Sequence, residues 1–295
     1  MQDINAILVN AFTMDGKGGN SAGVVLNADD LSYSEKLKIA QAVGYSETAF
    51  VSKDDEVDFE VSFFTVTDEV DFCGHATLAT FSTLFNKKLI VAGKYKQRTK
   101  AGVLAVNVEE NGLVVMEQAC PNYLQTFEYD DIAYLIGLPV DILSSTQLPI
   151  EVISTGLHDV IVSVPSGYLD KLQIDNEKLS VFCKKHNLIG MHAFELNDSE
   201  SEFTASCRNF APLFGIPEES ATGSSTGALA CYLVKHVFKD KESFDFVFEQ
   251  GRAMGCASRL SAAVKLNSGQ VTKVEVGGFA QQIGQLKVDS NNCVE

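Results

Sequence analysis

Residues 71–79 read Asp71-Phe72-Cys73-Gly74-His75-Ala76-Thr77-Leu78-Ala79. They end a strand region and open a helix whose residues are too small and too apolar for an exposed surface. The same pattern returns downstream in Ala221-Thr222-Gly223-Ser224-Ser225-Thr226-Gly227-Ala228-Leu229-Ala230. We therefore predict two similar units, each with a buried helix that carries His75 or Ser224 at its N-terminus. Such an N-terminus presents unpaired NH groups and positive dipole charge, so the pair suits an anionic ligand.

The length and composition predict a globular protein of two domains. The chain has 295 residues, of which 45% are hydrophobic and 21% are charged, and this length exceeds the usual size of a single core. We place the first domain at 1–120, with 280–295 returning to it, and the second at 121–279. No apolar run reaches the ~18 residues of a membrane span, and the first residues lack the features of a signal peptide. We therefore expect a cytoplasmic protein that does not bind a membrane.

The charge and the cysteines exclude several classes of function. A net charge of −16 repels polyanions and disfavours nucleic acid as a partner. The seven cysteines are odd in number, widely spaced and without a C-x-x-C pair, which argues against a disulfide framework and a zinc site. Most are expected to be buried small hydrophobes. Because no P-loop, dinucleotide fingerprint or metal-ligand cluster is present, we expect no metal and no cofactor.

Hydrophobic periodicity and turn residues predict the main elements. Ser32 and Glu35 have capping-box spacing before a helix that Gly44 ends, and the Asn111-Gly112 pair indicates a hairpin. Predicted strands lie at 4–9, 22–26, 48–52, 57–63, 103–108, 113–116, 152–156, 160–164, 203–207, 244–249, 271–276 and 282–288. Predicted later helices lie at 75–85, 176–186 and 226–238.

Five strings carry a resemblance to a known family: Gly19-Asn20-Ser21-Ala22-Gly23-Val24-Val25, Ser46-Glu47-Thr48-Ala49-Phe50-Val51, Phe64-Thr65, Cys73-Gly74-His75-Ala76-Thr77 and Ala221-Thr222-Gly223-Ser224. In this order and spacing they resemble the PhzF-like isomerase family of phenazine biosynthesis over nearly the whole chain. The resemblance implies the α+β fold of diaminopimelate epimerase, in which two similar domains each roll a sheet around a central helix. It also implies an active site in the cleft between the domains, and a homodimer is common in the family.

Glu47 is the first candidate for catalysis. It precedes the apolar run Ala49-Phe50-Val51, where desolvation can raise the pKa of a carboxyl toward a value useful for proton transfer. The residues alone leave open a surface glutamate after a helix. The resemblance favours catalysis, because the general acid/base glutamate of the family matches Glu47.

His75 and Ser224 are the candidates at the two helix N-termini. The helix dipole opposes a cation there, so His75 is expected to be neutral and able to donate a hydrogen bond or carry a proton. Ser224 and Gly223 lie where a substrate carboxylate can be held, and Gly223 allows close approach. A core histidine and a simple N-cap serine are the alternatives. The resemblance favours the functional roles and implies substrate-binding roles for Asn20, Ser46, Gly74, Thr222 and Gly223.

Glu219 is carried over as a further catalytic residue with a longer side chain. The family pattern is Glu-Asp-Pro, whereas this chain has Glu218-Glu219-Ser220, and a solvated loop glutamate is the alternative. Other departures are Ser21 and Val66 where the family has proline, and Cys256-Ala257 where it often has Arg-Pro. These changes can alter loop rigidity, so the substrate is not inherited.

Cys73 opens an alternative function. Amino-acid epimerases and racemases of this fold use two thiols, one on each side of the α-carbon. The matching turn of the second unit holds Thr222, which disfavours a two-thiol mechanism and leaves Cys73 as a buried hydrophobe. Asp159 beside His158, and the string Gly251-Arg252-Ala253-Met254-Gly255, are explained as strand-end and bulge residues.

The sequence thus predicts a cofactor-independent isomerase that moves a proton on a small carboxylate-bearing metabolite. Glu47 acts as the general acid/base, while His75, Glu219 and Ser224 orient the substrate and stabilise charge. The alternatives are an epimerase or racemase that uses Cys73, and a non-catalytic protein that binds small acids.

Overall fold

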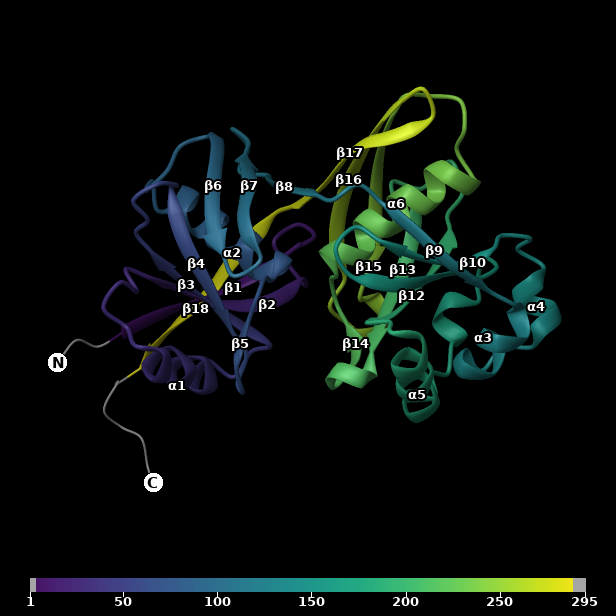
Figure 1. Ribbon diagram of the computed structural model, residues 1–295, viewed down its shortest axis with the longest axis horizontal. Helices are drawn as coiled ribbons and strands as arrows, with labels where there is room; N and C mark the ends of the chain where they lie inside the picture. Colours follow the sequence, from purple (N-terminus) through teal and green to yellow (C-terminus); the bar gives the residue numbers. More distant parts are fainter. Residues whose placement is uncertain (1–3, 289–295) are drawn as a thin grey trace. The chain divides into compact units, whose positions relative to one another are not determined.

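The computed structural model describes residues 4–288 (Figure 1). The chain forms two compact units. The first unit runs to Glu117 and resumes at Gly277, and the second unit is Gln118–Val276. Within the described range, no helix has the length and apolar character needed to cross a membrane.

The first unit is a sheet with two helices. Its strands are β1 (Ile4–Ala11), β2 (Asn20–Leu26), β3 (Glu47–Ser52), β4 (Phe59–Phe64), β5 (Glu69–Val70), β6 (Gly93–Thr99), β7 (Gly102–Val108), β8 (Val114–Gln118) and β18 (Ala280–Val288). Its helices are α1 (Tyr33–Val43) and α2 (Gly74–Asn86). The capping box of Ser32 and Glu35 begins α1, and Gly44 ends it in the left-handed conformation, with φ 72°. The hairpin predicted at Asn111-Gly112 is confirmed by the antiparallel pairing of β7 and β8.

The second unit contains the remaining elements. Its strands are β9 (Asn122–Phe127), β10 (Ile150–Ser154), β11 (His158–Ser163), β12 (Gly190–Leu196), β13 (Ala205–Ala211), β14 (Ile216–Glu219), β15 (Ser243–Gln250), β16 (Ser258–Asn267) and β17 (Gln270–Gly278). Its helices are α3 (Tyr129–Ile136), α4 (Val140–Ser144), α5 (Asn176–His186) and α6 (Gly223–His236), with short 3₁₀ turns at Leu169–Lys171, Pro212–Phe214 and Arg252–Met254.

Strand pairing follows the same order in both units. In the first, β1–β2 is antiparallel, β2–β3 parallel, β3–β4 antiparallel, β4–β6 parallel and β6–β7 antiparallel. In the second, the pairs β10–β11, β11–β12, β12–β13, β13–β15 and β15–β16 repeat this alternation. In each unit the second parallel connection contains a short strand and then the buried helix, which is β5 and α2 in one and β14 and α6 in the other. The internal repeat predicted from two small-residue segments is therefore a repeat of the topology.

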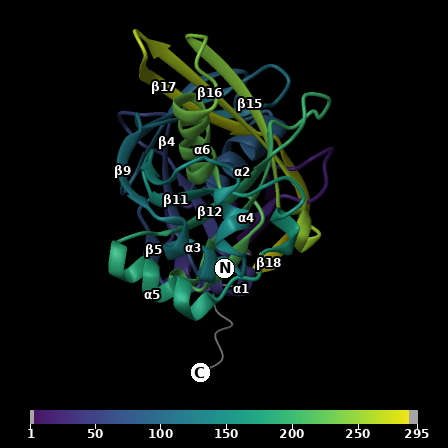
Figure 2. The ribbon, with the colours of Figure 1, turned by 90° about the vertical axis from the view of Figure 1, so that its right-hand side faces the viewer.

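The two buried helices form the centres of their units. In α2 the residues from His75 to Leu84 are all buried, and the helix packs against β1, β2, β3, β7 and β18. In α6 the residues from Ser225 to Val234 are buried, and the helix packs against β10, β11, β15 and β16 (Figure 2). Small side chains allow this close packing: a Cβ on Gly227 would come 1.9 Å from Oε1 of Gln118.

Several sequence predictions of the elements need correction. The helix predicted at 226–238 begins earlier, at Gly223, because Ser224 and Ser225 belong to its first turn. The prediction also missed β5, β6, β9, β12, β14, β16, α3 and α4. β6, for example, reads Gly-Lys-Tyr-Lys-Gln-Arg-Thr and lacks an apolar alternation, but it pairs with both β4 and β7. Pairing with neighbouring strands outweighs local composition there.

Candidate active site

Glu47 and His75 meet in the first unit. Glu47 is the first residue of β3 and pairs with Ala22 of β2, while His75 is the second residue of α2. Oε2 of Glu47 lies 3.3 Å from Nε2 of His75, with 18% and 7% of the side chains exposed. The parallel β2–β3 pair therefore brings the carboxylate to the N-terminus of the buried helix, a contact that the sequence did not predict.

Three further candidates surround the imidazole of His75. Sγ of Cys73 lies 3.3 Å from Nδ1, and Nδ2 of Asn20 lies 3.5 Å from the same nitrogen. Oγ of Ser46 lies 3.5 Å from Nε2. Gly74 begins α2 directly before His75. The predicted residues of the first unit thus form one polar cluster around a buried ring.

Burial controls the charge of His75. Desolvation lowers the pKa of His75, and the charge of Glu47 and a hydrogen bond to the backbone of Ser21 oppose this effect. The imidazole is therefore neutral at neutral pH, as the sequence predicts. Oε2 of Glu47 is inaccessible to solvent and has no hydrogen bond of good geometry among the described residues. Leaving a buried acceptor without such a bond costs free energy, so this oxygen is available to a partner that can donate to it.

Glu47, Cys73 and His75 are also a potential metal-ligand set, because their ligand atoms lie within 4.8 Å of one another. A tetrahedral Zn²⁺ with bond lengths of about 2.0–2.3 Å would need a thiolate and an imidazole nitrogen about 3.6 Å apart. The thiol lies closer to Nδ1, at 3.3 Å, than to Nε2, at 3.9 Å, whereas the carboxylate contacts Nε2. The groups form a row of thiol, imidazole and carboxylate, so they fit proton transfer better than metal binding.

The candidates of the second unit form another cluster around the start of α6. Oγ1 of Thr222 donates to Oε2 of Glu219 over 2.5 Å. Gln250, which the sequence analysis missed, donates through Nε2 to the carbonyl of Glu219 over 2.7 Å and accepts from the NH of Thr222 over 3.2 Å. Gly251 follows Gln250 with φ 88°, and a Cβ there would meet the carbonyl of Ser220 at 2.7 Å. The backbone thus holds Gln250 in place through a tight turn.

Side chains from outside α6 contact the backbone carbonyl groups of its first turn. Nε2 of Gln118 donates to the carbonyl of Gly223 over 2.8 Å, while Oγ1 of Thr155 donates to Oε1 of Gln118 over 2.7 Å and lies 3.2 Å from the carbonyl oxygen of Ser224. Neither Thr222 before α6 nor Cys73 before α2 makes a side-chain capping bond, whereas Ser32 caps α1 and Asp175 caps α5. The two central helices therefore keep first-turn NH groups that no side chain of the N-cap satisfies.

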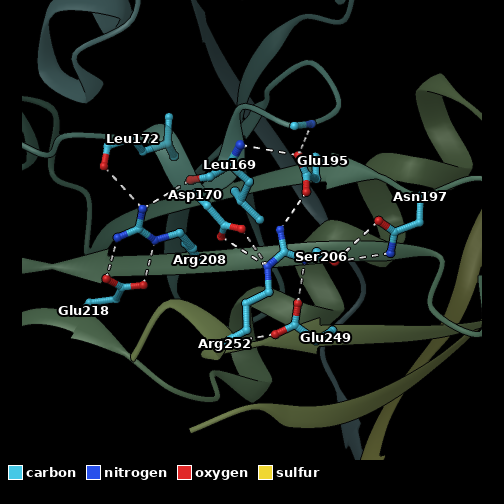
Figure 3. A network of polar contacts seen from close by, with 11 residues as sticks. Leu169, Asp170, Leu172, Glu195, Asn197, Ser206, Arg208, Glu218, Glu249 and Arg252 are labelled. Carbon is cyan, nitrogen blue, oxygen red and sulfur yellow. Dashed lines mark hydrogen bonds and ion pairs between the residues drawn. The ribbon is translucent and has the colours of Figure 1, made fainter. Parts of the chain in front are cut away.

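An arginine clamp, the ion pair of Arg208 with Glu218, joins β13 to β14 (Figure 3). Arg208 of β13 donates to both carboxylate oxygens of Glu218, over 2.8 and 2.7 Å. It also donates to the carbonyl of Leu169 over 3.2 Å. Successive strand residues point to opposite faces, so the clamp on Glu218 leaves Glu219 directed toward Thr222. No local pattern predicts this pair, because Arg208 and Glu218 meet only through strand pairing.

The two-unit fold is also found in solved structures of other proteins. A hydroxyproline epimerase from Agrobacterium vitis has the same fold, with a TM-score of 0.62 at 10% identity over 99% of this chain and 93% of that chain. A phenazine biosynthesis protein of the PhzF family from Bacillus anthracis is much more similar, with a TM-score of 0.89 at 30% identity over 98% and 99% of the two chains. The predicted diaminopimelate epimerase-like fold is confirmed.

The sequence relatives identify the family. The model of the phenazine biosynthesis-like protein family matches residues 9–284. An uncharacterized isomerase of Clostridium acetobutylicum is 33% identical over 94% of this chain and 95% of its own length. The trans-2,3-dihydro-3-hydroxyanthranilate isomerase of Pseudomonas chlororaphis is 30% identical over 95% and 97%. The chain belongs to the phenazine biosynthesis-like, or PhzF, family, and it is an isomerase of that family.

Proposed function

We propose that this isomerase moves a proton between two atoms of a small carboxylate-bearing metabolite without a cofactor, with Glu47 as the general acid/base. The contact between Glu47 and the neutral His75 is the observation that carries the proposal. A carboxylate can accept a proton and return it, and a neutral imidazole beside it can donate a hydrogen bond to developing charge. Asn20 and Ser46 lie around the same ring and are proposed to contact the substrate.

The start of α6 is proposed to bind an anionic group of the substrate. Its first-turn NH groups carry positive dipole charge, and Gly223 lets a ligand approach the backbone. Ser224 supplies a hydroxyl in the same turn. Glu219, held by Thr222 and Gln250, is proposed as a hydrogen-bond acceptor or second acid. The isomerase from Pseudomonas chlororaphis is named for a substrate with a carboxylate, which supports this class of ligand.

An epimerase that uses Cys73 is the second candidate. Cys73 is buried at the N-cap of α2 and contacts Nδ1 of His75, which favours some acid–base role for its thiol. However, the N-cap of α6, the corresponding position of the topological repeat, is Thr222. Inversion of a stereocentre needs a base on one face and an acid on the other, and a threonine hydroxyl is a poor partner for a thiol in that reaction.

The test is Glu47→Gln, which keeps the shape of the side chain and removes the proton carrier. The first substrate to try is trans-2,3-dihydro-3-hydroxyanthranilate, followed by other small cyclic and acyclic carboxylates, with proton movement observed by NMR in heavy water. We expect turnover to fall at least about 100-fold, in the usual range for general acid/base catalysis. Glu60→Gln, on the exposed side of β4, is the matched control. A Glu47→Gln enzyme that retains more than about a tenth of the rate would exclude Glu47 as the base.

Incorporation of deuterium separates the two candidates. The proposed isomerase places at most one deuterium at the acceptor carbon and leaves the donor stereocentre uninverted. Inversion with deuterium at the inverted carbon would support the epimerase. Affinity for small acids without proton exchange in any of them would indicate a binding protein instead.

A further inference from the structure

Four buried polar side chains form a continuous chain of contacts in the second unit. They come from four elements: Asp159 from β11, His192 from β12, Asn209 from β13 and Ser225 from α6. Their exposed fractions are 2%, 1%, 3% and 0%. Buried polar groups are costly unless they are hydrogen-bonded, and apolar side chains would pack at these positions without that cost. The cluster therefore needs a reason beyond simple core packing.

The contacts have a defined direction. Nδ2 of Asn209 donates to Oγ of Ser225 over 2.9 Å and lies 3.2 Å from Nδ1 of His192. Oγ of Ser225 in turn donates to Oδ2 of Asp159 over 2.6 Å. An amide nitrogen only donates, so Nδ1 of His192 accepts and the proton of this neutral ring lies on Nε2. Burial lowers the pKa of His192 to about 3, which agrees with a neutral ring. Each link thus depends on the orientation of the one before it.

Asn209 connects the end of β14, which carries Glu219, with the first turn of α6, which carries Ser224. Its backbone pairs with His192 on one side and with Glu219 on the other. Its side chain holds Ser225, which directly follows Ser224 in the first turn of α6. A single residue of β13 is therefore linked by its backbone to Glu219 and by its side chain to the turn that carries Ser224.

This link matters because the start of α6 has no side-chain cap. An uncapped first turn frays more easily, since no hydrogen bond to an N-cap side chain is lost when the turn opens. The side-chain hydrogen bonds of Ser225 hold the first turn in place of an N-cap, and they do not involve the NH groups of the turn. Nε2 of His192 has no hydrogen-bond partner among the described residues, so the satisfied part of the network runs from Asn209 through Ser225 to Asp159. Satisfied buried hydrogen bonds restrict a structure to one arrangement.

We propose that Asp159, Asn209 and Ser225 are positioning residues that hold the first turn of α6 at a fixed place relative to the end of β14. They thereby keep Ser224 and Glu219 in the mutual arrangement that the proposed function requires. The catalytic purpose of this positioning rests on the proposed function. The link between the first turn of α6 and β14 can be tested without any substrate.

The first test measures local opening by hydrogen exchange and mass spectrometry on peptides that cover 216–228. Ser225→Ala removes the hydroxyl without adding bulk, and Asn209→Leu keeps the branched shape without the amide. The control is Tyr232→Phe, which removes a buried hydrogen bond to the carbonyl of Pro149 near the other end of the same helix. Ser225→Ala and Asn209→Leu should speed exchange in this segment about tenfold or more, and the double variant should add little. Tyr232→Phe should leave the segment at the wild-type rate.

The second test measures turnover of trans-2,3-dihydro-3-hydroxyanthranilate, or of the acid that the screen identifies. Ser225→Ala should lower kcat at least tenfold with a smaller change in KM, and Ser225→Cys, which keeps a weak donor of similar volume, should recover part of the loss. Tyr232→Phe should retain kcat. Equal exchange in Ser225→Ala and Tyr232→Phe overturns the proposal, whether or not a substrate is known. If the wild type turns over none of the acids, the proposed function is refuted. The hydrogen-exchange result then still decides whether these residues position the first turn of α6.

Discussion

Replacement of His192 by asparagine should make the protein less sensitive to acid. The pKa of His192 lies at about 3 in the folded protein against 6.5 for an ordinary histidine, because burial disfavours the cation. A lowered folded pKa means that the unfolded chain binds a proton first as pH falls below 6.5. Stability is therefore fully present above this pH and is lost progressively toward pH 3.

The size of the effect follows from the same two pKa values. Each pH unit in this window is worth about 1.4 kcal/mol, so the wild type should lose about 2 kcal/mol between pH 7.5 and pH 5 through His192 alone. Asparagine can accept from Asn209 through its side-chain oxygen but cannot titrate. Its smaller volume leaves a cavity that costs a constant amount at every pH.

The measurement is urea unfolding followed by far-ultraviolet circular dichroism, since the chain has no tryptophan. The free energy of unfolding is compared at pH 7.5 and pH 5 in the wild type and in His192→Asn. Other buried groups contribute in both proteins: desolvation lowers the pKa of His75 and raises that of Asp159, and their effects cancel in the comparison. If both proteins lose the same stability on acidification, the burial argument for His192 is wrong.

Three further outcomes are expected. Cys73→Ser should retain most of the activity, measured as turnover at saturating substrate, because the proposed mechanism needs no thiolate; complete loss in a folded variant would favour the epimerase. Gly251→Ala should lower stability by about 3 kcal/mol in thermal unfolding, since φ is 88° and the new Cβ meets backbone oxygens at 2.6 and 2.7 Å. Gly255→Ala, with φ 70° and open space around the Cβ, should cost only about 1 kcal/mol, and an equal cost in the two variants would contradict this account. Protein treated with a chelator and freed of nicotinamide, flavin and pyridoxal should keep its full rate, and restoration of a lost rate by an added metal or cofactor would overturn the proposed mechanism.

Local sequence patterns determined those features of the protein that depend on residues close together in the chain, such as helix caps and helices. The capping box at Ser32 and the helix at 176–186 were both predicted and are both observed. The two small-residue segments predicted the central helices, because only small side chains let a helix pack closely on all sides. The five strings, three of which contain Asn20, Glu47 and His75, indicated the family, which the comparisons confirm.

Tertiary structure decided which side chains meet. The contact of Glu47 with His75 depends on the register of β2 with β3, and the links of Asn209 depend on the pairing of β12, β13 and β14. A shift of one residue in any of these pairs would turn the side chains to the other face. Asp159 lies at the start of β11, as the sequence predicts, but neither its burial nor its hydrogen bond from Ser225 was predicted. Such contacts join residues far apart in the chain, and no periodicity or local motif records the strand register that creates them.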